Sequence, residues 1–174
     1  MPRDKFNLSD NDKKLLSKIK SFLNKRDYNL AKEKIHKRLK KITEPKSQID
    51  FYLLAELGGF LIDICEEGKD EQAGKDGLEI LKRLGNNWPN FLWKASYEYN
   101  LANGYESLFK CKQLKGEIKF KPDSIDLLKR AKNHYWRAYK LNSSSDYFSL
   151  RPNFLVNLGN SLSRNGRVIE AFQF

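Results

Sequence analysis

The sequence is poor in cysteine and in long apolar runs, and each shortage excludes a class of protein. Two cysteines in 174 residues are too few for a disulfide framework. The longest apolar region, Phe51 to Cys65, is interrupted by Glu56 and Asp63, so it falls short of the ~20 apolar residues of a membrane span. The polar, charged N-terminal segment is unlike a secretory signal. We therefore expect a cytoplasmic protein without a membrane partner.

Recognisable catalytic signatures are lacking too. The chain has no P-loop, no dinucleotide-binding glycine motif, no paired-histidine zinc motif and no nucleophile elbow. Its two histidines, His36 and His134, and its two cysteines, Cys65 and Cys111, are widely separated in the sequence. A metal site would need such residues to converge with carboxylates, and ordinary buried or surface side chains are the simpler interpretation. The sequence predicts no enzymatic activity, no metal and no cofactor.

Positive charge is abundant but uneven. The formal net charge is +11, from 33 Lys and Arg against 22 Asp and Glu. Residues 1–50 carry a net charge of +8, residues 51–100 of −4, residues 101–150 of +5 and residues 151–174 of +2. A basic balance suits nucleic acid or another anionic surface, but it does not indicate a fold.

Apolar residues recur every three or four positions along most of the chain, which is typical of amphipathic helices. Residues that suit an N-cap or a first turn mark the expected helix starts: Ser9, Asp27, Ser47, Pro89, Asp123 or Ser124, and Pro152. The stretch from Ser47 to Glu66 is apolar around most of its circumference, which predicts a helix buried between neighbours. The sequence thus predicts an all-α fold.

The end of the chain, LVNLGNSLSRNGRVIEAFQF, resembles the tetratricopeptide repeat (TPR), a helix-turn-helix unit of about 34 residues. The matching residues are Leu158, Gly159, Leu162, Gly166 and Ala171. The small residues among them suit two antiparallel helices in close contact. Residues 99–105, followed by Ala131, Tyr135 and Ala138, resemble a second such unit.

This resemblance implies an α-α superhelical solenoid of TPR-like helical hairpins over residues 1–174. The hairpins are expected at about residues 9–43, 47–85, 89–143 and 152–174. The first two fit the repeat less closely, and unrelated helical hairpins explain them equally well. An insertion is expected at 107–124, because Tyr105 and Ala131 are 26 positions apart where the last repeat has 9.

The last hairpin is incomplete when the chain reaches Phe174. Solenoids need terminal repeats with a polar outer face, and the final residues, which include Ala171 and Phe172, would be half-covered. We therefore expect the N-terminal part of a longer protein, with a further domain downstream in the same polypeptide.

The resemblance also implies a non-catalytic scaffold that binds a peptide or a partner domain in a concave groove. Asn100 and Asn103 share one helix face, and Asn157 and Asn160 hold the equivalent places one repeat later. Carboxamides both donate and accept hydrogen bonds, which suits the backbone of an extended peptide. Arg164, one turn beyond Asn160, would add a contact to a carboxylate. These five residues are the predicted partner-binding site.

Nucleic acid is the alternative partner. The segment KEKIHKRLKK at residues 32–41 and the segment CKQLKGEIKFK at residues 111–121 concentrate cations that would attract phosphate. The candidate contacts are Lys34, Lys37, Arg38, Lys41, Lys112, Lys115, Lys119 and Lys121. The chain is also similar to bacterial TPR proteins that carry a C-terminal HEPN ribonuclease domain. That similarity implies that this chain is the sensor half, or RNA-binding half, of a ribonuclease or toxin-type protein.

Overall fold

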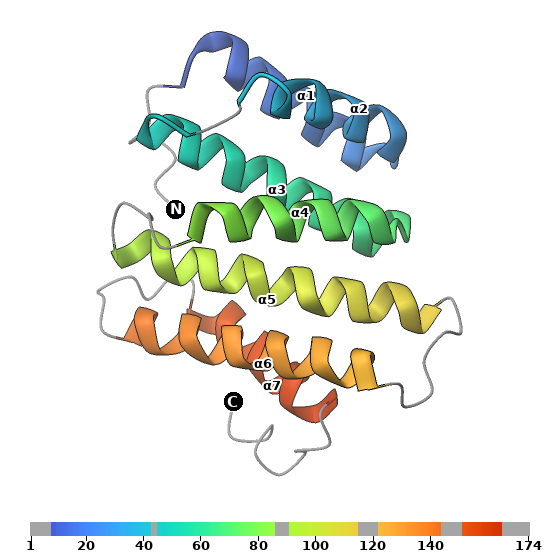
Figure 1. Ribbon diagram of the computed structural model, residues 1–174, viewed down its shortest axis with the longest axis vertical. Coiled ribbons are helices and arrows are strands. Elements are labelled where there is room, and N and C mark those ends of the chain that lie inside the picture. The colour runs from blue at the N-terminus through green and yellow to red at the C-terminus, as the bar shows by residue number, and fades with distance from the viewer. Residues whose placement is uncertain (1–7, 43–44, 86–90, 115–121, 144–150, 165–174) are drawn as a thin grey trace.

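The computed structural model describes residues 8–42, 45–85, 91–114, 122–143 and 151–164. Over these ranges the chain is all-α, with seven helices and no strand, which confirms the all-α part of the predicted fold (Figure 1). The helices are α1 (Asp10–Asn24), α2 (Tyr28–Leu39), α3 (Gln48–Gly68), α4 (Glu71–Leu84), α5 (Phe91–Leu114), α6 (Pro122–Ser143) and α7 (Arg151–Arg164). None of these helices is long and apolar enough to cross a membrane.

Side-chain caps fix where several helices begin. Ser9 accepts a hydrogen bond from the Asp12 amide at the start of α1. Ser47 and Asp50 form a reciprocal capping box at the start of α3. Asp27 stands at the N-cap position of α2 but makes no side-chain cap hydrogen bond. The sequence predicts that Asp123 or Ser124 caps α6, but the helix already begins at Pro122, so both residues lie inside its first turn.

The helices pair in chain order and stack along the long axis of the molecule, from α1 and α2 to α6 and α7 (Figure 1). Side-chain contacts link the second helices of successive pairs, either directly or through Tyr105 of α5. His36 Nε2 on α2 is 3.6 Å from the Asp76 carboxylate on α4. Lys82 of α4 and Arg130 of α6 both lie over the ring of Tyr105. We call α2, α4 and α6 the second-helix layer, and α1, α3, α5 and α7 the first-helix layer.

Helix α3 is the centre of the core, as its apolar circumference predicts. Eleven of its residues are buried, and it packs against α1, α2, α4 and α5. Two glycines allow α3 and α4 to approach closely: a Cβ on Gly77 would lie 2.7 Å from the Gly58 carbonyl oxygen. Real Cβ atoms do not come so close to a backbone oxygen. Glycine at this crossing is therefore required by the packing.

The insertion expected at residues 107–124 is largely helix. Helix α5 continues without a break to Leu114, and α6 begins at Pro122. The long spacing between Tyr105 and Ala131 thus comes mainly from extra turns on both helices. This hairpin is longer than its neighbours and has the most extensive contact between any two helices of the described chain.

Several sequence predictions lie outside the described residues. They concern Lys115, Lys119 and Lys121, the start of the third hairpin at Pro89, and the second helix of the last repeat with Gly166 and Ala171.

Candidate functional site

Two adjoining hollows lie along the first-helix layer. The larger, of about 410 Å³, lies between α1 and α3 and is lined by Lys20, Leu23, Asn24, Arg26, Phe60, Asp63 and Glu67. The smaller, of about 170 Å³, lies between α3 and α5 and is lined by Ala55, Glu56, Gly59, Phe60, Ile62, Asp63, Asn100 and Asn103. Phe60 and Asp63 belong to both linings, so the two hollows form one groove across three helices. We call this surface the α1–α3–α5 groove.

The floor of the groove is open at Gly59. A Cβ built on this glycine has no atom within 4 Å, in contrast to the crowded Gly77. The neighbouring Phe60 is 7% exposed, and Lys20 Nζ lies 5.6 Å from the centre of its ring. The groove therefore combines an apolar wall with open space where a helix normally carries a side chain.

The middle of the groove is acidic although the whole chain is basic. Helix α3 carries five acidic residues and no lysine or arginine. Asp63 is exposed to solvent, but the packed side chains around it partly desolvate its carboxyl. This desolvation, followed by repulsion from Glu67, Glu66 and Glu56, raises the pKa of Asp63 to about 6, while Lys20 lowers it. A positively charged group that enters the groove would relieve this repulsion.

The four predicted asparagines do not form one free row. Asn100 and Asn103 line the smaller hollow, as a ligand contact requires. Asn157 Nδ2 instead donates to the Tyr99 hydroxyl at 2.6 Å, and Asn160 lies exposed on α7. The structure thus brings only the first pair to the groove.

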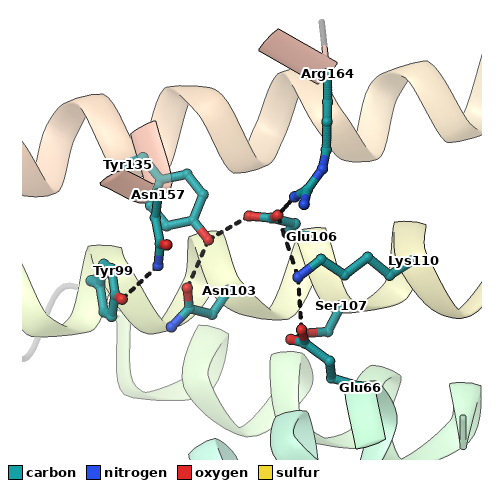
Figure 2. Close-up of polar contacts among 9 residues, drawn as sticks. All are labelled: Glu66, Tyr99, Asn103, Glu106, Ser107, Lys110, Tyr135, Asn157 and Arg164. Atoms are coloured by element: carbon teal, nitrogen blue, oxygen red, sulfur yellow. Dashed lines mark hydrogen bonds and ion pairs between the residues drawn. The ribbon is translucent and has the colours of Figure 1, made fainter. Parts of the chain in front are cut away.

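Asn103 also takes part in a buried polar network (Figure 2). Tyr135 Oη lies 2.7 Å from Asn103 Oδ1 and 2.7 Å from Glu106 Oε2. Burial raises the pKa of Tyr135, so its hydroxyl stays protonated and remains a donor. Figure 2 shows the amide nitrogen of Asn103 pointing away from Tyr135. Burial raises the pKa of the Tyr99 hydroxyl, and a hydrogen bond from Asn103 lowers it, so this amide also has a partner within the protein.

Arg164, predicted to contact a ligand carboxylate, forms an ion pair with a carboxylate of the protein itself. Its partner is Glu106, which is 5% exposed and also lies 3.5 Å from Lys110 (Figure 2). Lys110 continues the network to Glu66, which also accepts from Ser107 at 2.8 Å. Burial alone would raise the pKa of Glu66, but the hydrogen bonds from Lys110 and Ser107 outweigh it and lower that pKa. The network joins α3, α5, α6 and α7.

The basic candidates on α2 are partly neutralised. Arg38 Nε lies 3.1 Å from Asp12, and Lys34 Nζ lies 3.3 Å from Glu33. Lys112 is half-exposed, and Lys37 and Lys41 are exposed. The predicted phosphate-binding residues therefore do not form one uninterrupted positive surface over the described ranges.

The histidines and cysteines make internal contacts. His134 Nδ1 lies 2.6 Å from the buried Glu98 and stacks on Tyr105. Cys65 and Cys111 are both buried. Burial and the neighbouring Cys111 raise the pKa of Cys65 to about 12, which keeps it a neutral thiol. Among the described residues, no group of three His, Cys, Asp or Glu side chains could hold a metal ion.

Sequence reasoning missed the residues at the centre of the groove, Gly59, Phe60 and Asp63. One signal pointed to them: Glu56, Asp63 and Glu67 are spaced by seven and four positions, so they share one face of an otherwise apolar helix. Such a charged stripe on a largely buried helix indicates a side of the helix that faces solvent.

Comparison of the chain with protein-family models, with curated proteins and with solved structures gave no match.

Proposed function

We propose that this chain is a non-catalytic scaffold that binds an extended segment of a protein partner in the α1–α3–α5 groove. The observation that carries the proposal is the pair of adjoining hollows that share Phe60 and Asp63. The stacked hairpins are consistent with a TPR-like α-α solenoid, in which the first helices of successive pairs line the concave side.

The lining of the groove favours a segment that contains lysine or arginine. The acidic side chains of α3 supply charge complementarity, and Phe60 supplies an apolar wall for the stem of a long basic side chain. Asn100 and Asn103, which line the smaller hollow, would bind the backbone of the segment.

A displayed library of random peptides tests this proposal. We expect the purified chain to select peptides enriched in Lys and Arg. Gly59→Leu should abolish their binding, because its side chain would occupy the groove where no atom now lies within 4 Å. Gly59→Ala is the matched control and should bind nearly as well, since its methyl group fills little of the space.

Asp63→Asn provides a second variant that keeps the shape of the groove. We expect it to weaken the selected basic peptides by about tenfold, in line with the loss of one close charge pair. A library without enrichment, or selected peptides that bind Gly59→Leu as tightly as the unchanged protein, would refute the assignment of the groove.

A further inference from the structure

The second-helix layer carries a separate feature, an aromatic and basic strip on the solvent side of α6. Lys129, Lys132, Trp136 and Lys140 follow one another at spacings of three and four residues, so they share one helix face. Trp136 is 40% exposed, which is unusual for so large an apolar side chain. With the adjacent Tyr139, we call these five residues the α6 strip.

The aromatic members of the strip form a stacked pair. The ring centres of Trp136 and Tyr139 are 5.6 Å apart, with an angle of 28° between the planes. Lys140 Nζ lies 5.3 Å from the centre of the Trp136 ring. A partly exposed indole supported by a second ring and flanked by cations can stack on a planar base next to a phosphate.

The surrounding charge favours an anionic partner. Helix α6 carries five Lys and Arg residues against two Asp residues, and one of those acids, Asp126, is taken by Arg130 at 2.6 Å. Positive charge continues onto α4, where Lys82 shares the face of Tyr105 with Arg130. The acidic residues of α3 lie in the other layer.

We propose that the α6 strip binds single-stranded nucleic acid, with Trp136 stacked on a base and with Lys129 and Lys132 on neighbouring phosphates. A single strand is favoured over a duplex because only unpaired bases expose their faces for stacking. A membrane surface fits less well, because the apolar face of α6, with Leu128, Ala131 and Ala138, is buried in the core and cannot enter a bilayer. This inference does not depend on the proposed peptide groove.

Fluorescence anisotropy with labelled oligo-U and oligo-dT tests the lysines. Binding is expected at about 50 mM salt and should weaken steeply by about 200 mM. The double variant Lys129→Ala/Lys132→Ala should lower the slope of log K against log salt by about 1.4, as expected for two lost phosphate contacts on a single strand. The control Lys14→Ala/Lys25→Ala removes the same charge from exposed positions at α1 and should change the slope little.

Substitution of the tryptophan tests the stacking. Trp136→Ala should weaken oligonucleotide binding by about tenfold, whereas Trp136→Phe should retain most of it because it keeps a ring. Circular dichroism would verify that each variant remains folded. The proposal is overturned if neither oligonucleotide binds at low salt, if the α1 control loses as much affinity as the α6 variant, or if phosphatidylserine vesicles bind while the oligonucleotides do not.

Discussion

Gly77 and Gly59 lie in adjacent helices, but Gly77 is crowded by neighbouring atoms and Gly59 faces open space. This contrast predicts opposite effects of alanine on stability at the two positions. A Cβ on Gly77 would lie 2.7 Å from the Gly58 carbonyl oxygen, so Gly77→Ala must push α3 and α4 apart. We expect this variant to lose about 1–2 kcal/mol of unfolding free energy, after the helix-propensity gain of about 1 kcal/mol is deducted from the packing cost.

Gly59→Ala is the matched control, since its methyl group meets nothing within 4 Å. It should stabilise the protein by about 0.5–1 kcal/mol. Urea unfolding of both variants, followed by circular dichroism, measures the two effects. Equal stabilities would show that the close helix crossing at Gly77 is not required.

The raised pKa of Asp63 predicts how stability changes with pH. Because its folded pKa of about 6 lies above the ordinary aspartate pKa of 3.8, the folded protein binds the proton more tightly than the unfolded chain. The contribution of this group to stability is therefore greatest below pH ~4 and is lost as pH rises through about 6. Asp63→Asn should be more stable than the unchanged protein at pH 7, and the difference should shrink toward pH 4.

Thermal unfolding between pH 4 and pH 7 measures this difference. The control is Asp10→Asn, because Asp10 is exposed at the start of α1. Asp50→Asn is not suitable, since Asp50 belongs to a capping box. If Asp63→Asn gave no extra stability at pH 7, Asp63 would not be under the repulsion that makes the groove favourable for a cation.

At the scale of single helices, the capping side chains differ in a testable manner. Ser47 and Asp50 cap α3 reciprocally, whereas Asp27 at the same position of α2 makes no side-chain cap hydrogen bond. Ser47→Ala should cost about 1 kcal/mol of unfolding free energy, and Asp27→Ala should cost clearly less. Chemical denaturation of the two variants side by side compares them, and a larger loss for Asp27→Ala would contradict the prediction.

Helix α7 depends on the buried network for its attachment to α5. Replacing Arg164 leaves the buried Glu106 with Lys110 as a nearby cation and the Tyr135 hydroxyl as a neutral hydrogen-bond donor. Arg164→Met should therefore destabilise the packing of α7 by about 1–3 kcal/mol. Hydrogen exchange of the α7 amides should accelerate while α3 stays protected.

The exposed Asn160 on the same helix supplies the control for this experiment. Asn160→Ala should leave the exchange of α7 nearly unchanged, because surface substitutions of this kind are close to neutral. If both variants exchanged alike, the ion pair with Glu106 would not hold α7 in place.

The helices themselves could be predicted from the sequence because their signals are local. The apolar period, Ser9, Ser47 and Pro152 gave the starts of α1, α3 and α7 to within one or two residues. The spacing predicts the insertion at 107–124 but not its conformation, because distance along the chain does not distinguish a loop from extra helical turns. Spacing between repeat landmarks measures residues, not conformation.

The site was only partly predictable because its contacts are long-range. Asn100 and Asn103 were expected on a shared helix face and do line the groove. That Arg164 would find Glu106, and that Asn157 would find Tyr99 58 positions away, follows only from how the hairpins stack. Polar residues look alike in a sequence whether they will face a ligand or another part of the core.

At the scale of the whole molecule, a net charge of +11 conceals two layers of different character. Glu56, Asp63 and Glu67 of α3 lie at the groove in the first-helix layer, together with Lys20 and Arg26. Much of the positive charge lies on α2 and α6 in the second-helix layer. The separation of signs allows one molecule to present a cation-binding groove and an anion-binding strip.

This separation predicts that the two proposed surfaces work independently. They lie in different helix layers, and salt at about 0.15 M screens exposed charges beyond about 8 Å. A saturating basic peptide from the library should therefore leave the oligonucleotide Kd within about twofold of its value without peptide. Because coupling between two sites is reciprocal, the oligonucleotide should change the peptide Kd by the same small factor. Anisotropy titrations with and without the peptide measure the coupling.

Two variants make the test of independence complete. Gly59→Leu should lose the peptide and keep the oligonucleotide. Lys129→Ala/Lys132→Ala should keep the peptide and bind the oligonucleotide more weakly. If the peptide displaced the oligonucleotide, or if either variant lost both ligands while remaining folded, the two ligands would share one surface. In that case the groove and the α6 strip could not both be assigned as proposed, because an acidic groove cannot serve as the common site for a basic peptide and a phosphate chain.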